Sequence, residues 1–332
     1  MSQRSDSHLV TVVLVAYYGD EWIQECLHSL AQASHRRLHL LLVDNAGTTR
    51  LDPHALEAFD AEILRTSRPY GFAEANNFAL VNASALGKFV LFLNQDTKSP
   101  PGWIDTCIQM MEDNSELGGV SPLIRTYNDD GWDPSFLACL DVEQREALGN
   151  PTIDNLLYAP HAPAAALIVR TEVLQLAGPF DPIFGSYYED YDLCRRIRRH
   201  GYRIAFASQA RICHFSGSTT TSREKELARM RLILRNRFIH QLRESSGSRA
   251  RQVVRHFVFA LPRRLARGLA RTSSSQPPLV TLRAFGDIAR ELPRLISTER
   301  DQNDWQTYLD SIGWSERFPS LQRTPAVETS TT

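Results

Sequence analysis

A continuous apolar run near the N-terminus, Leu9–Tyr17, constrains the fold of this chain more than any other stretch. The run reads Leu-Val-Thr-Val-Val-Leu-Val-Ala-Tyr, so it is rich in β-branched residues and has no regular polar alternation. Such a run is typical of a strand covered on both faces, as in the parallel sheets of α/β proteins. We therefore expect Leu9–Tyr17 to be a central strand.

The segments that follow alternate between helical and strand-like patterns. Apolar residues recur at helical spacing over 20–33, and residues 38–43 have the pattern of a second strand. Strand, helix and strand at this spacing form a βαβ unit, which produces a parallel pair. The alternation continues with strands at 61–65, 88–93, 118–124, 163–170 and 202–207 and helices at 72–86, 100–113 and 171–177. We expect an α/β domain with a mostly parallel sheet, in which the irregular segment 125–158 is a substrate loop.

Polar residues follow three of the predicted strands at the point where each strand ends. They are Tyr17-Tyr18, Asp44-Asn45 and Asn94-Gln95-Asp96. In an open parallel sheet, ligands bind outside the carboxyl ends of the strands. Asp and Asn also end strands because they form turns and cap helices, which is the alternative for any single group. The occurrence of three such groups favours a binding crevice.

The segment 184–201 places Glu189, Asp190 and Asp192 directly before a run of arginines that Gly201 ends. This pattern predicts a short helix with acid at its start and base at its end, which also complements the helix dipole. A carboxylate at a helix N-terminus is normally ionised near neutral pH and can accept a proton. A catalytic base and a structural cap both remain open from this stretch alone.

Asp96 is a candidate ligand for a hard divalent cation, with Asn94 two positions before it. Mg²⁺ prefers few protein ligands and keeps substrate oxygens in its shell, so one firm carboxylate can suffice. His214 is either a second ligand, a contact to phosphates or an ordinary hydrogen-bonded side chain. The sequence has no Gly-x-Gly-x-x-Gly and no Gly-Lys-Ser/Thr phosphate loop, which counts against dinucleotide oxidoreductases and nucleotide triphosphatases.

The cysteines and the N-terminus bear on the cellular compartment. Five cysteines are widely spread and never form Cys-x-x-Cys, which argues for a reducing cytosol and against a disulfide framework or a cysteine zinc site. The first eight residues are polar, and no apolar run approaches the roughly 20 residues that cross a bilayer. We expect a cytoplasmic protein without signal peptide or membrane span.

The last third of the chain is basic and helical in pattern. The net charge is −1, yet Arg223–Arg271 holds thirteen Arg and one Lys against three Glu, a local balance of 14 − 3 = +11. Helical patterns cover 223–242, 249–270 and 279–296, so we divide the chain into a domain at 1–222 and a helical extension at 223–332. The amphipathic segment 249–270 could lie on an anionic membrane, at the inner face of the plasma membrane, or pack on its own body or a second subunit. No nucleic-acid partner is expected.

Short motifs spread over residues 9–218 resemble glycosyltransferase family 2, and within it the rhamnosyltransferase-like bacterial members. They occur in family order: Val12–Tyr17, Leu42–Asn45, Gly71–Asn77, Leu91–Thr97, Pro101–Trp103, Phe180–Phe184, Tyr188–Cys194 and Gly201–Arg203. The resemblance implies a Rossmann-like nucleotide-diphospho-sugar transferase (GT-A) domain, with a donor half at about 9–125 and an acceptor half at about 126–222. It also implies inverting transfer of a sugar from a nucleoside diphosphate to a saccharide or lipid-linked acceptor in cell-surface polysaccharide biosynthesis.

The resemblance also implies roles for individual positions. Mg²⁺ or Mn²⁺ would sit on Asp96, with His214 as the further candidate ligand, and Asp190 would be the general base, with Glu189 shaping the acceptor side. The nucleotide sugar would contact Ala16, Tyr17, Asp44, Asn45, Gly71, Asn76, Asn77, Asn94, Gln95 and Asp96. Asn94 replaces the first Asp of the family's Asp-x-Asp, which should weaken metal binding. Tyr18 and Ala164 replace the usual Asn and Gly, which changes the local shape of the pocket.

Two other functions compete with this interpretation. A sugar-nucleotide nucleotidyltransferase would need a Gly-rich basic loop after the first strand, whereas Tyr17–Glu21 is acidic. A catalytically degenerate scaffold at the membrane is favoured by Asn94 and Tyr18 but opposed by the intact Glu189-Asp190 pair. Hydrolysis of a donor by the purified protein would separate these cases.

Overall fold

A computed structural model describes residues 9–148, 156–215, 223–244, 248–270 and 278–319. Within this described part the strands form one nine-stranded sheet in the order β3-β2-β1-β4-β8-β6-β9-β5, with β7 paired to β9. The strands are β1 Val10–Ala16, β2 His39–Asp44, β3 Asp60–Arg65, β4 Phe89–Asn94, β5 Thr97–Lys98, β6 Leu117–Thr126, β7 Leu156–Ala159, β8 Ala166–Arg170 and β9 Arg203–His214.

The half of the sheet built from β3, β2, β1 and β4 is parallel throughout. Strand β6 also pairs parallel with β9, whereas β8, β5 and β7 run antiparallel to their neighbours. Strand β1 is almost entirely buried, as its continuous apolar run predicts. The predicted α/β fold with a mostly parallel central sheet is confirmed, and the carboxyl ends of β1, β2 and β4 meet at one edge.

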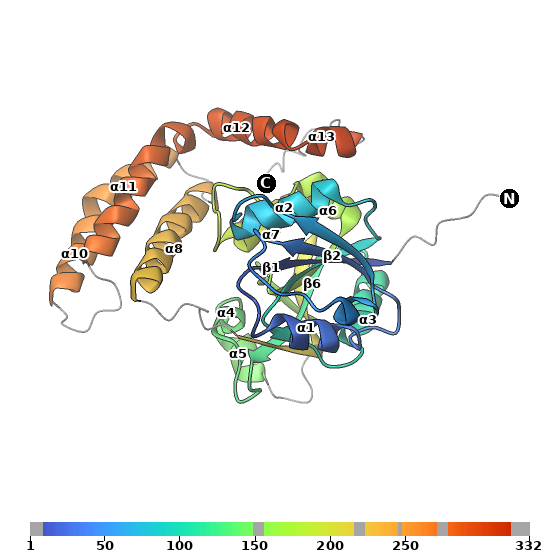
Figure 1. The fold of residues 1–332 in the computed structure, drawn as a ribbon. Helices are drawn as coiled ribbons and strands as arrows, with labels where there is room; N and C mark the ends of the chain where they lie inside the picture. Colours follow the sequence, from blue (N-terminus) through green and yellow to red (C-terminus); the bar gives the residue numbers. More distant parts are fainter. Residues whose placement is uncertain (1–8, 149–155, 216–222, 245–247, 271–277, 320–332) are drawn as a thin grey trace.

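Helices cover both faces of this sheet (Figure 1), with α2, α6 and α7 on one side and α1 and α3 on the other. The helices of the body are α1 Ile23–Leu30, α2 Phe72–Asn82, α3 Trp103–Asp113, α4 Pro134–Leu137, α5 Val142–Ala147, α6 Thr171–Ala177 and α7 Glu189–Arg199, with a 3₁₀ turn at Pro53–Leu56. The predicted irregular segment 125–158 thus contains two short helices and β7. Asp133 and Asp141 cap these two helices with their side chains.

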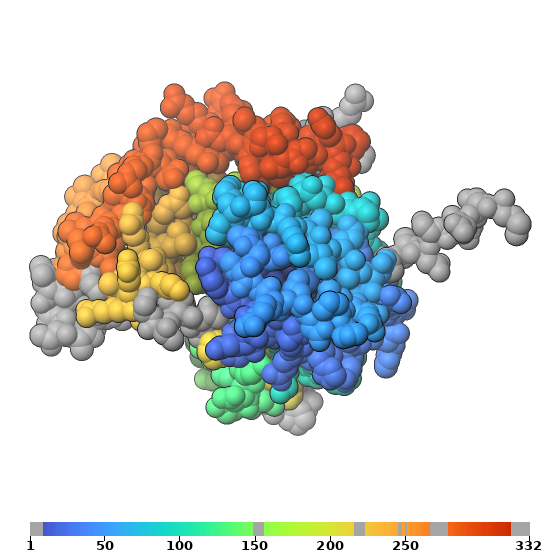
Figure 2. Space-filling model, in the orientation of Figure 1, coloured from blue at the N-terminus to red at the C-terminus, as the bar shows by residue number. Residues whose placement is uncertain are grey.

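The C-terminal third is helical, as predicted, and lies along the body (Figure 2). It comprises α8 Arg223–Glu244, α9 Arg249–Arg255, a π-helical turn His256–Ala260, α10 Leu261–Ala270, α11 Pro278–Leu295, α12 Thr298–Ser311 and α13 Trp314–Arg317. The predicted helix 249–270 is therefore interrupted by a π-helical turn, and α12 and α13 were not predicted. None of the helices in the described ranges is long and apolar enough to cross a membrane.

An apolar cluster joins the helical extension to the loop before α7. Ile183 and Phe184 from that loop pack with Phe238, Ile239 and Leu242 of α8 and Ile288 of α11. Phe184, Ile239 and Ile288 are 0% exposed. The boundary that we expected at residue 222 therefore separates two segments that share a core.

Buried ion pairs reinforce this junction. Arg243 of α8 is 5% exposed, and its guanidinium lies 2.8 Å from the carboxylate of Asp181 and 2.6 Å from that of Asp301 in α12. The same guanidinium lies 3.4 Å from Asp192 of α7. Arg235, and Arg231 in a more exposed position, pair with Glu291 and Asp287 of α11. Part of the basic surplus of 223–271 is therefore neutralised inside the protein.

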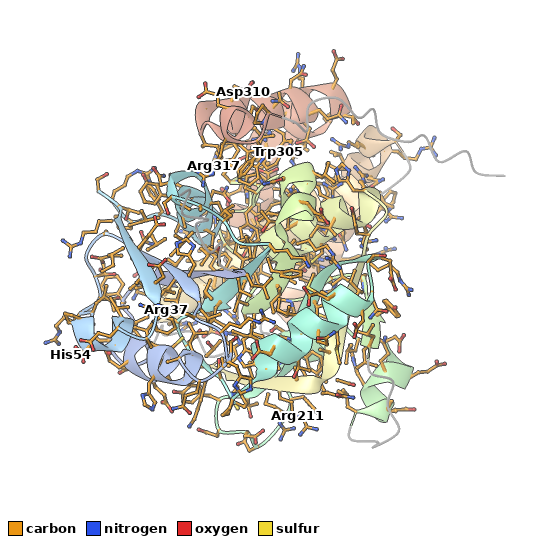
Figure 3. The ribbon with its side chains drawn as sticks, turned by 90° about the vertical axis from the view of Figure 1, so that its right-hand side faces the viewer. Arg37, His54, Arg211, Trp305, Asp310 and Arg317 are labelled. Atoms are coloured by element: carbon orange, nitrogen blue, oxygen red, sulfur yellow. The ribbon has the colours of Figure 1, made fainter. Side chains whose placement is uncertain are left out.

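The last two helices, α12 and α13, lie over the face of the body that carries α2 and α6 (Figure 1), and Figure 3 labels Trp305 and Arg317 in them. Trp305 packs on the guanidinium of Arg196 in α7, with 4.9 Å between the Cζ atom and the ring centroid. Arg317 donates hydrogen bonds to the carbonyls of Val81 and Ala83 at 3.2 and 2.6 Å. A cation at the C-terminus of α2 satisfies carbonyls that have no partner within the helix.

Candidate active site

A cavity of about 700 Å³ opens at the carboxyl ends of β1 and β4 and at the start of α7. Nine of the residues singled out from the sequence line it: Tyr17, Asn45, Gly71, Asn94, Gln95, Asp96, Glu189, Asp190 and His214. Asp96 and Asp190 therefore open onto one cavity although 94 positions of sequence separate them. A volume of this size is within the range of small-molecule sites.

Four other candidate residues do not line this cavity. Ala16 is fully buried at the end of β1, and Asp44 is 5% exposed at the end of β2. One Asp44 oxygen lies 3.2 Å from Nε of Arg65, while the other is buried and has no hydrogen-bond partner within the described residues. An unsatisfied buried carboxylate oxygen is costly, so this atom of Asp44 is an unusual feature of the end of β2.

Asn76 and Asn77 have positions that differ from the expectation that they line the nucleotide-sugar pocket. Both are buried in α2, and the Asn76 amide donates to the carbonyl of Phe72 at 2.8 Å. The Asn77 side chain donates to the carbonyl of Phe180 at 2.6 Å and accepts from its N–H at 2.9 Å. Asn77 also bonds the hydroxyl of Tyr308 in α12 at 2.7 Å. The Asn77 side chain therefore holds α2 against the Phe180 loop and α12, whereas the Asn76 amide bonds within α2 itself.

Two amides of the cavity wall are likewise engaged with backbone. The Gln95 side chain accepts a hydrogen bond from the Tyr17 N–H at 2.9 Å and donates to the Tyr17 carbonyl at 2.7 Å. The Asn45 side chain accepts from the N–H of Tyr70 at 2.9 Å and donates to its carbonyl at 3.0 Å. These contacts fix the loops after β2 and β4, and they leave the Tyr17 ring, 39% exposed, at the cavity.

The polar corner of the cavity holds Asp96, His214 and Asn94. Nε2 of His214 lies 3.5 Å from Asp96 Oδ1 and 3.2 Å from the Asn94 amide. Nδ1 of His214 lies 3.0 Å from a carboxylate oxygen of Asp133, a residue that is 0% exposed. The Asp133 carboxylate faces Nδ1 and accepts a hydrogen bond from it. This contact orients the imidazole ring so that Nε2 points toward the cavity.

The charge of His214 reflects these neighbours. Burial alone opposes the imidazolium, but hydrogen bonds from the ring to Asp133 and Asp96 outweigh it and raise the pKa to about 9. No group of three or more His, Cys, Asp or Glu side chains gathers as a cation site among the described residues. Asp96 and His214 nevertheless fit a cation that takes its other ligands from a substrate diphosphate, since carboxylate and imidazole are acceptable ligands for Mn²⁺ and carboxylate for Mg²⁺.

Asp190 lies in the first turn of α7 and lines the cavity. It accepts hydrogen bonds from the N–H groups of Tyr191 at 2.8 Å and Ala164 at 3.3 Å. Burial raises the pKa of this carboxyl to about 6, although those two hydrogen bonds act in the opposite direction. The position is that of a carboxylate that is ionised at neutral pH yet more basic than an ordinary aspartate.

Glu189 and Asp192 occupy different environments from Asp190. Glu189 is 6% exposed, and burial together with the charge of Asp190 raises its pKa well above the usual range. Its Oε2 atom is buried and lacks a partner among the described residues. Asp192 points away into the core, where Arg196 at 2.8 Å and Arg195 at 2.7 Å hold it. The third carboxylate of the acidic cluster is therefore structural.

The far wall contains residues that the sequence did not reveal as candidates. Tyr187, Tyr188 and Tyr191 line the cavity together with Arg229 and Ile233 from α8. Tyr191 stacks on His161 with ring centroids 3.6 Å apart, and burial lowers the His161 pKa to about 3. The only signal in the sequence was the repeat of tyrosines around Glu189-Asp190. Arg229 lay within a long basic run and could not be distinguished from its neighbours.

Comparison with known proteins identifies the family and supports the fold. The sequence profile described as glycosyltransferase-like family 2 matches residues 7–231. A pre-mycofactocin glycosyltransferase of Mycobacterium tuberculosis is 27% identical over 211 residues, which cover 62% of this chain and 42% of that protein. This chain therefore spans less than half the length of that relative. An N-acetylglucosaminyl-diphospho-decaprenol L-rhamnosyltransferase of the same organism is 22% identical over 245 residues, with 64% and 78% covered.

Solved structures with low sequence identity share the fold. A mannosyltransferase from Pyrobaculum calidifontis, solved with GDP-Man and Mn²⁺, has a TM-score of 0.54 at 18% identity and covers 96% of this chain and 89% of its own. The first 349 residues of S. aureus TarS, solved with UDP-GlcNAc, have a TM-score of 0.50 at 17% identity, with 93% and 91% covered. These likenesses confirm the predicted GT-A fold. Because the family profile extends over most of the chain, this protein belongs to the glycosyltransferase-like family 2.

Proposed function

We propose that this protein is an inverting glycosyltransferase that moves a sugar from a nucleoside-diphosphate sugar to a saccharide or lipid-linked acceptor. The observation that carries the proposal is the shared cavity, with Asp96 and His214 in one part of its wall and Glu189 and Asp190 in another. Inverting transfer needs a proton acceptor for the incoming hydroxyl and stabilisation of a departing diphosphate within one site. This cavity offers groups for both tasks.

Asp190 is proposed as the general base. Its pKa of about 6 leaves most of the carboxylate ionised at neutral pH, and its basicity exceeds that of an exposed aspartate. The acceptor oxygen attacks the anomeric carbon as the bond to the leaving phosphate oxygen breaks, and Asp190 takes the hydroxyl proton. Glu189, whose pKa is raised by burial and by the charge of Asp190, lines the cavity beside the base and is proposed to contact a sugar hydroxyl.

Asp96 and His214 are the residues that would hold Mg²⁺ or Mn²⁺, with Asn94 beside them. When bound, such a cation supplies positive charge that neutralises the departing diphosphate. The chain itself contributes the orientation of the imidazole through Asp133, at 3.0 Å from Nδ1. His214 must lose its proton to serve as a ligand, so binding of the cation releases a proton.

The nucleoside is proposed to lie across the ends of β1 and β2. The Tyr17 ring is available for stacking, and Asp44 has a buried carboxylate oxygen that can accept from a ribose hydroxyl. Gly71 lines the cavity and permits close packing of the turn before α7, because an added Cβ would lie 3.2 Å from the Gly185 carbonyl. A relative transfers L-rhamnose according to its name, so dTDP-rhamnose is the first donor that we propose to test.

The acceptor is proposed to carry a phosphate group near α8. Arg229 lines the cavity, and its Cζ lies 5.8 Å from the centroid of the Tyr187 ring. No carboxylate pairs with Arg229 in the described part of the chain, in contrast to Arg231 and Arg235. The acceptor named for one relative is a diphospho-decaprenol, which has such an anionic group. An unpaired guanidinium at a cavity wall is suited to bind phosphate.

Association with a membrane surface is proposed for the helical extension. Val254, Val258 and Phe259 are 57%, 55% and 53% exposed on α9 and the π-helical turn, and Arg251 and Arg255 are exposed beside them. Apolar side chains flanked by arginines favour the interface of an anionic bilayer. We propose that this surface holds the enzyme at the cytoplasmic face of the membrane, where a lipid-linked acceptor of cell-surface polysaccharide synthesis would be presented.

Release of nucleoside diphosphate tests the proposed function. Purified protein is incubated with dTDP-rhamnose, UDP-GlcNAc or GDP-mannose in the presence of Mg²⁺ or Mn²⁺. Asp190→Asn should keep the donor affinity and lose turnover by two or more orders of magnitude, which is the scale of general-base catalysis. Asp96→Ala should weaken donor binding measured by calorimetry only when the metal is present. Near-normal turnover of Asp190→Asn would refute the assignment of Asp190 as the general base. If the wild-type protein hydrolysed none of the donors, a non-catalytic scaffold would be favoured.

A further inference from the structure

Asn236 of α8 contacts the backbone of the turn that leads into Asp190. The side chain is 0% exposed, and its Nδ2 atom lies 2.7, 2.9 and 2.7 Å from the carbonyl oxygens of Phe184, Ser186 and Tyr187. An amide nitrogen has two hydrogens, so the three carbonyls share them. A single side chain therefore ties together three carbonyls within four consecutive residues.

The neighbouring residue fixes the orientation of this amide. Arg235 donates from Nη1 to the Asn236 Oδ1 at 2.8 Å and to the carbonyl of Ile183 at 2.6 Å. Its other terminal nitrogen pairs with Glu291 of α11 at 2.8 Å. A guanidinium can only donate, so the amide oxygen must face Arg235 and the amide nitrogen must face the turn. The hydrogen-bonding partners leave Asn236 no alternative orientation.

The turn that Asn236 holds has an unusual backbone. Tyr187 and Tyr188 have φ angles of 68° and 73°, a left-handed conformation that bulky residues rarely adopt and that the surrounding structure must enforce. The Tyr188 carbonyl then accepts from the N–H of Asp192 at 3.0 Å, which starts α7. The two left-handed residues immediately precede Glu189, so they determine where the first turn of α7 meets the cavity.

The opposite side of the turn is held by the donor half of the fold. The Gly185 carbonyl accepts from the N–H of Ala73 at 2.9 Å, and the Ser186 hydroxyl accepts from the N–H of Phe72 at 3.3 Å. The turn is thus fixed between α2 on one side and α8 on the other. Asn236 supplies the α8 side, and it lies five residues beyond residue 231, where the family match ends.

We propose that Asn236 is a positioning residue, which sets the place of Asp190 at the cavity by holding the left-handed turn 186–188. The inference rests on the proposed function, in which Asp190 is the general base. It makes the helical extension a part of the catalytic unit, because the side chain that stabilises the turn belongs to α8. Displacement of a catalytic group by about 1 Å can lower a rate about 100-fold.

Two substitutions weaken the hydrogen bonds between Asn236 and the turn to different extents. Asn236→Ala deletes all three hydrogen bonds, and Asn236→Ser keeps one donor. We expect kcat for hydrolysis of dTDP-rhamnose, or of whichever tested donor is turned over, to fall by roughly 100-fold in the alanine variant and by less in the serine variant. Donor affinity by calorimetry should stay within about twofold, since no donor-binding residue is changed. Leu234→Val, a change to a buried residue of the same helix that packs on α11 rather than on the turn, is the control for general destabilisation and should keep its kcat.

A double variant separates a positioning role from a purely structural one. If Asn236 acts through Asp190, then Asn236→Ala should lower kcat little further in the Asp190→Asn background, because the base is already absent. A multiplicative loss in the double variant, or a normal kcat in Asn236→Ala, would overturn the inference. Activity of Asp190→Asn itself would instead refute the proposed function, so the two failures are distinguishable. Circular dichroism and melting curves establish that each variant is folded before its kinetics are compared.

Discussion

Replacing Arg243 by Met should destabilise the protein severely although the residue lies outside the cavity. The guanidinium is 5% exposed and lies within 3.4 Å of three carboxylates on separate segments, those of Asp181, Asp192 and Asp301. Met retains most of the hydrocarbon stem and removes the charge. The variant therefore tests the ion pairs rather than the packing volume.

The size of the expected stability loss depends on which cationic partners each carboxylate retains in Arg243→Met. Asp192 retains Arg195 and Arg196, and Asp301 retains Arg249 at 3.1 Å. Asp181, 2% exposed, has no other cation within salt-bridge distance among the described residues. Removal of one partner from a buried pair costs about 3–5 kcal/mol, because a buried charge is left uncompensated. This is a large fraction of the 5–15 kcal/mol that stabilises a typical domain.

Urea unfolding at neutral pH measures the loss. We expect Arg243→Met to lower the free energy of unfolding by about 3–5 kcal/mol. The matched control is Arg251→Met, a change of an exposed arginine in α9, which should alter it by no more than about 0.5 kcal/mol. A loss below about 1 kcal/mol for Arg243→Met would refute the conclusion that this network holds the extension to the body.

Three further predictions concern the cavity. Burial raises the pKa of Asp190 from 3.8 to about 6, so the free energy of unfolding of the wild type falls by up to about 3 kcal/mol as the pH rises through that window. Asp190→Asn should therefore have a higher melting temperature than the wild type at pH 8 and an equal one near pH 3. A lower melting temperature of the variant at pH 8 would contradict this. Asp133→Asn can keep its cap on α4 through Oδ1, but it then presents an N–H donor to Nδ1 of His214 and favours the proton on Nε2. Mn²⁺ affinity by calorimetry should therefore fall about 10–100-fold, and unchanged affinity would contradict the proposal that Asp133 prepares His214 as a ligand. Arg229→Ala should raise KM for a phosphate-bearing acceptor about tenfold or more and leave the donor affinity unchanged. Arg223→Ala, a change at an exposed position of the same helix, should leave this KM unchanged. Equal effects of the two substitutions would reject a specific acceptor site at Arg229.

The parallel half of the fold was predictable because its signals are local. The apolar run that forms β1 needs no distant partner to be recognised, and the ends of β1, β2 and β4 meet because parallel strands share one edge. The convergence of Asp96 and Asp190 followed from the same rule together with the motifs of the family. Their chemical roles remain predictions.

The parts that escaped prediction depend on contacts between distant positions. The helical pattern of 72–86 could not show that Asn77 faces the Phe180 loop and Tyr308 rather than the cavity. Asn236 and Arg243 lay in a basic amphipathic run, where nothing local distinguishes a buried polar residue from a solvated one. Helices α12 and α13 are polar and gain stability from contacts such as Trp305 on Arg196, which only the folded chain brings together.

The attachment of α8 and α12 to the body also determines when the cavity can be completed during synthesis. Asp192 leaves the ribosome 301 − 192 = 109 residues before Asp301, the last member of the Arg243 network. At translation rates of roughly 5–20 residues per second, the Arg243 network would wait on the order of 5–20 seconds for its last member. In the first part of that interval, until α8 at Arg223–Glu244 has been made, Ile183 and Phe184 have no α8 to cover them. A ribosome stalled before residue 301 should therefore carry an incomplete junction between α8 and the body.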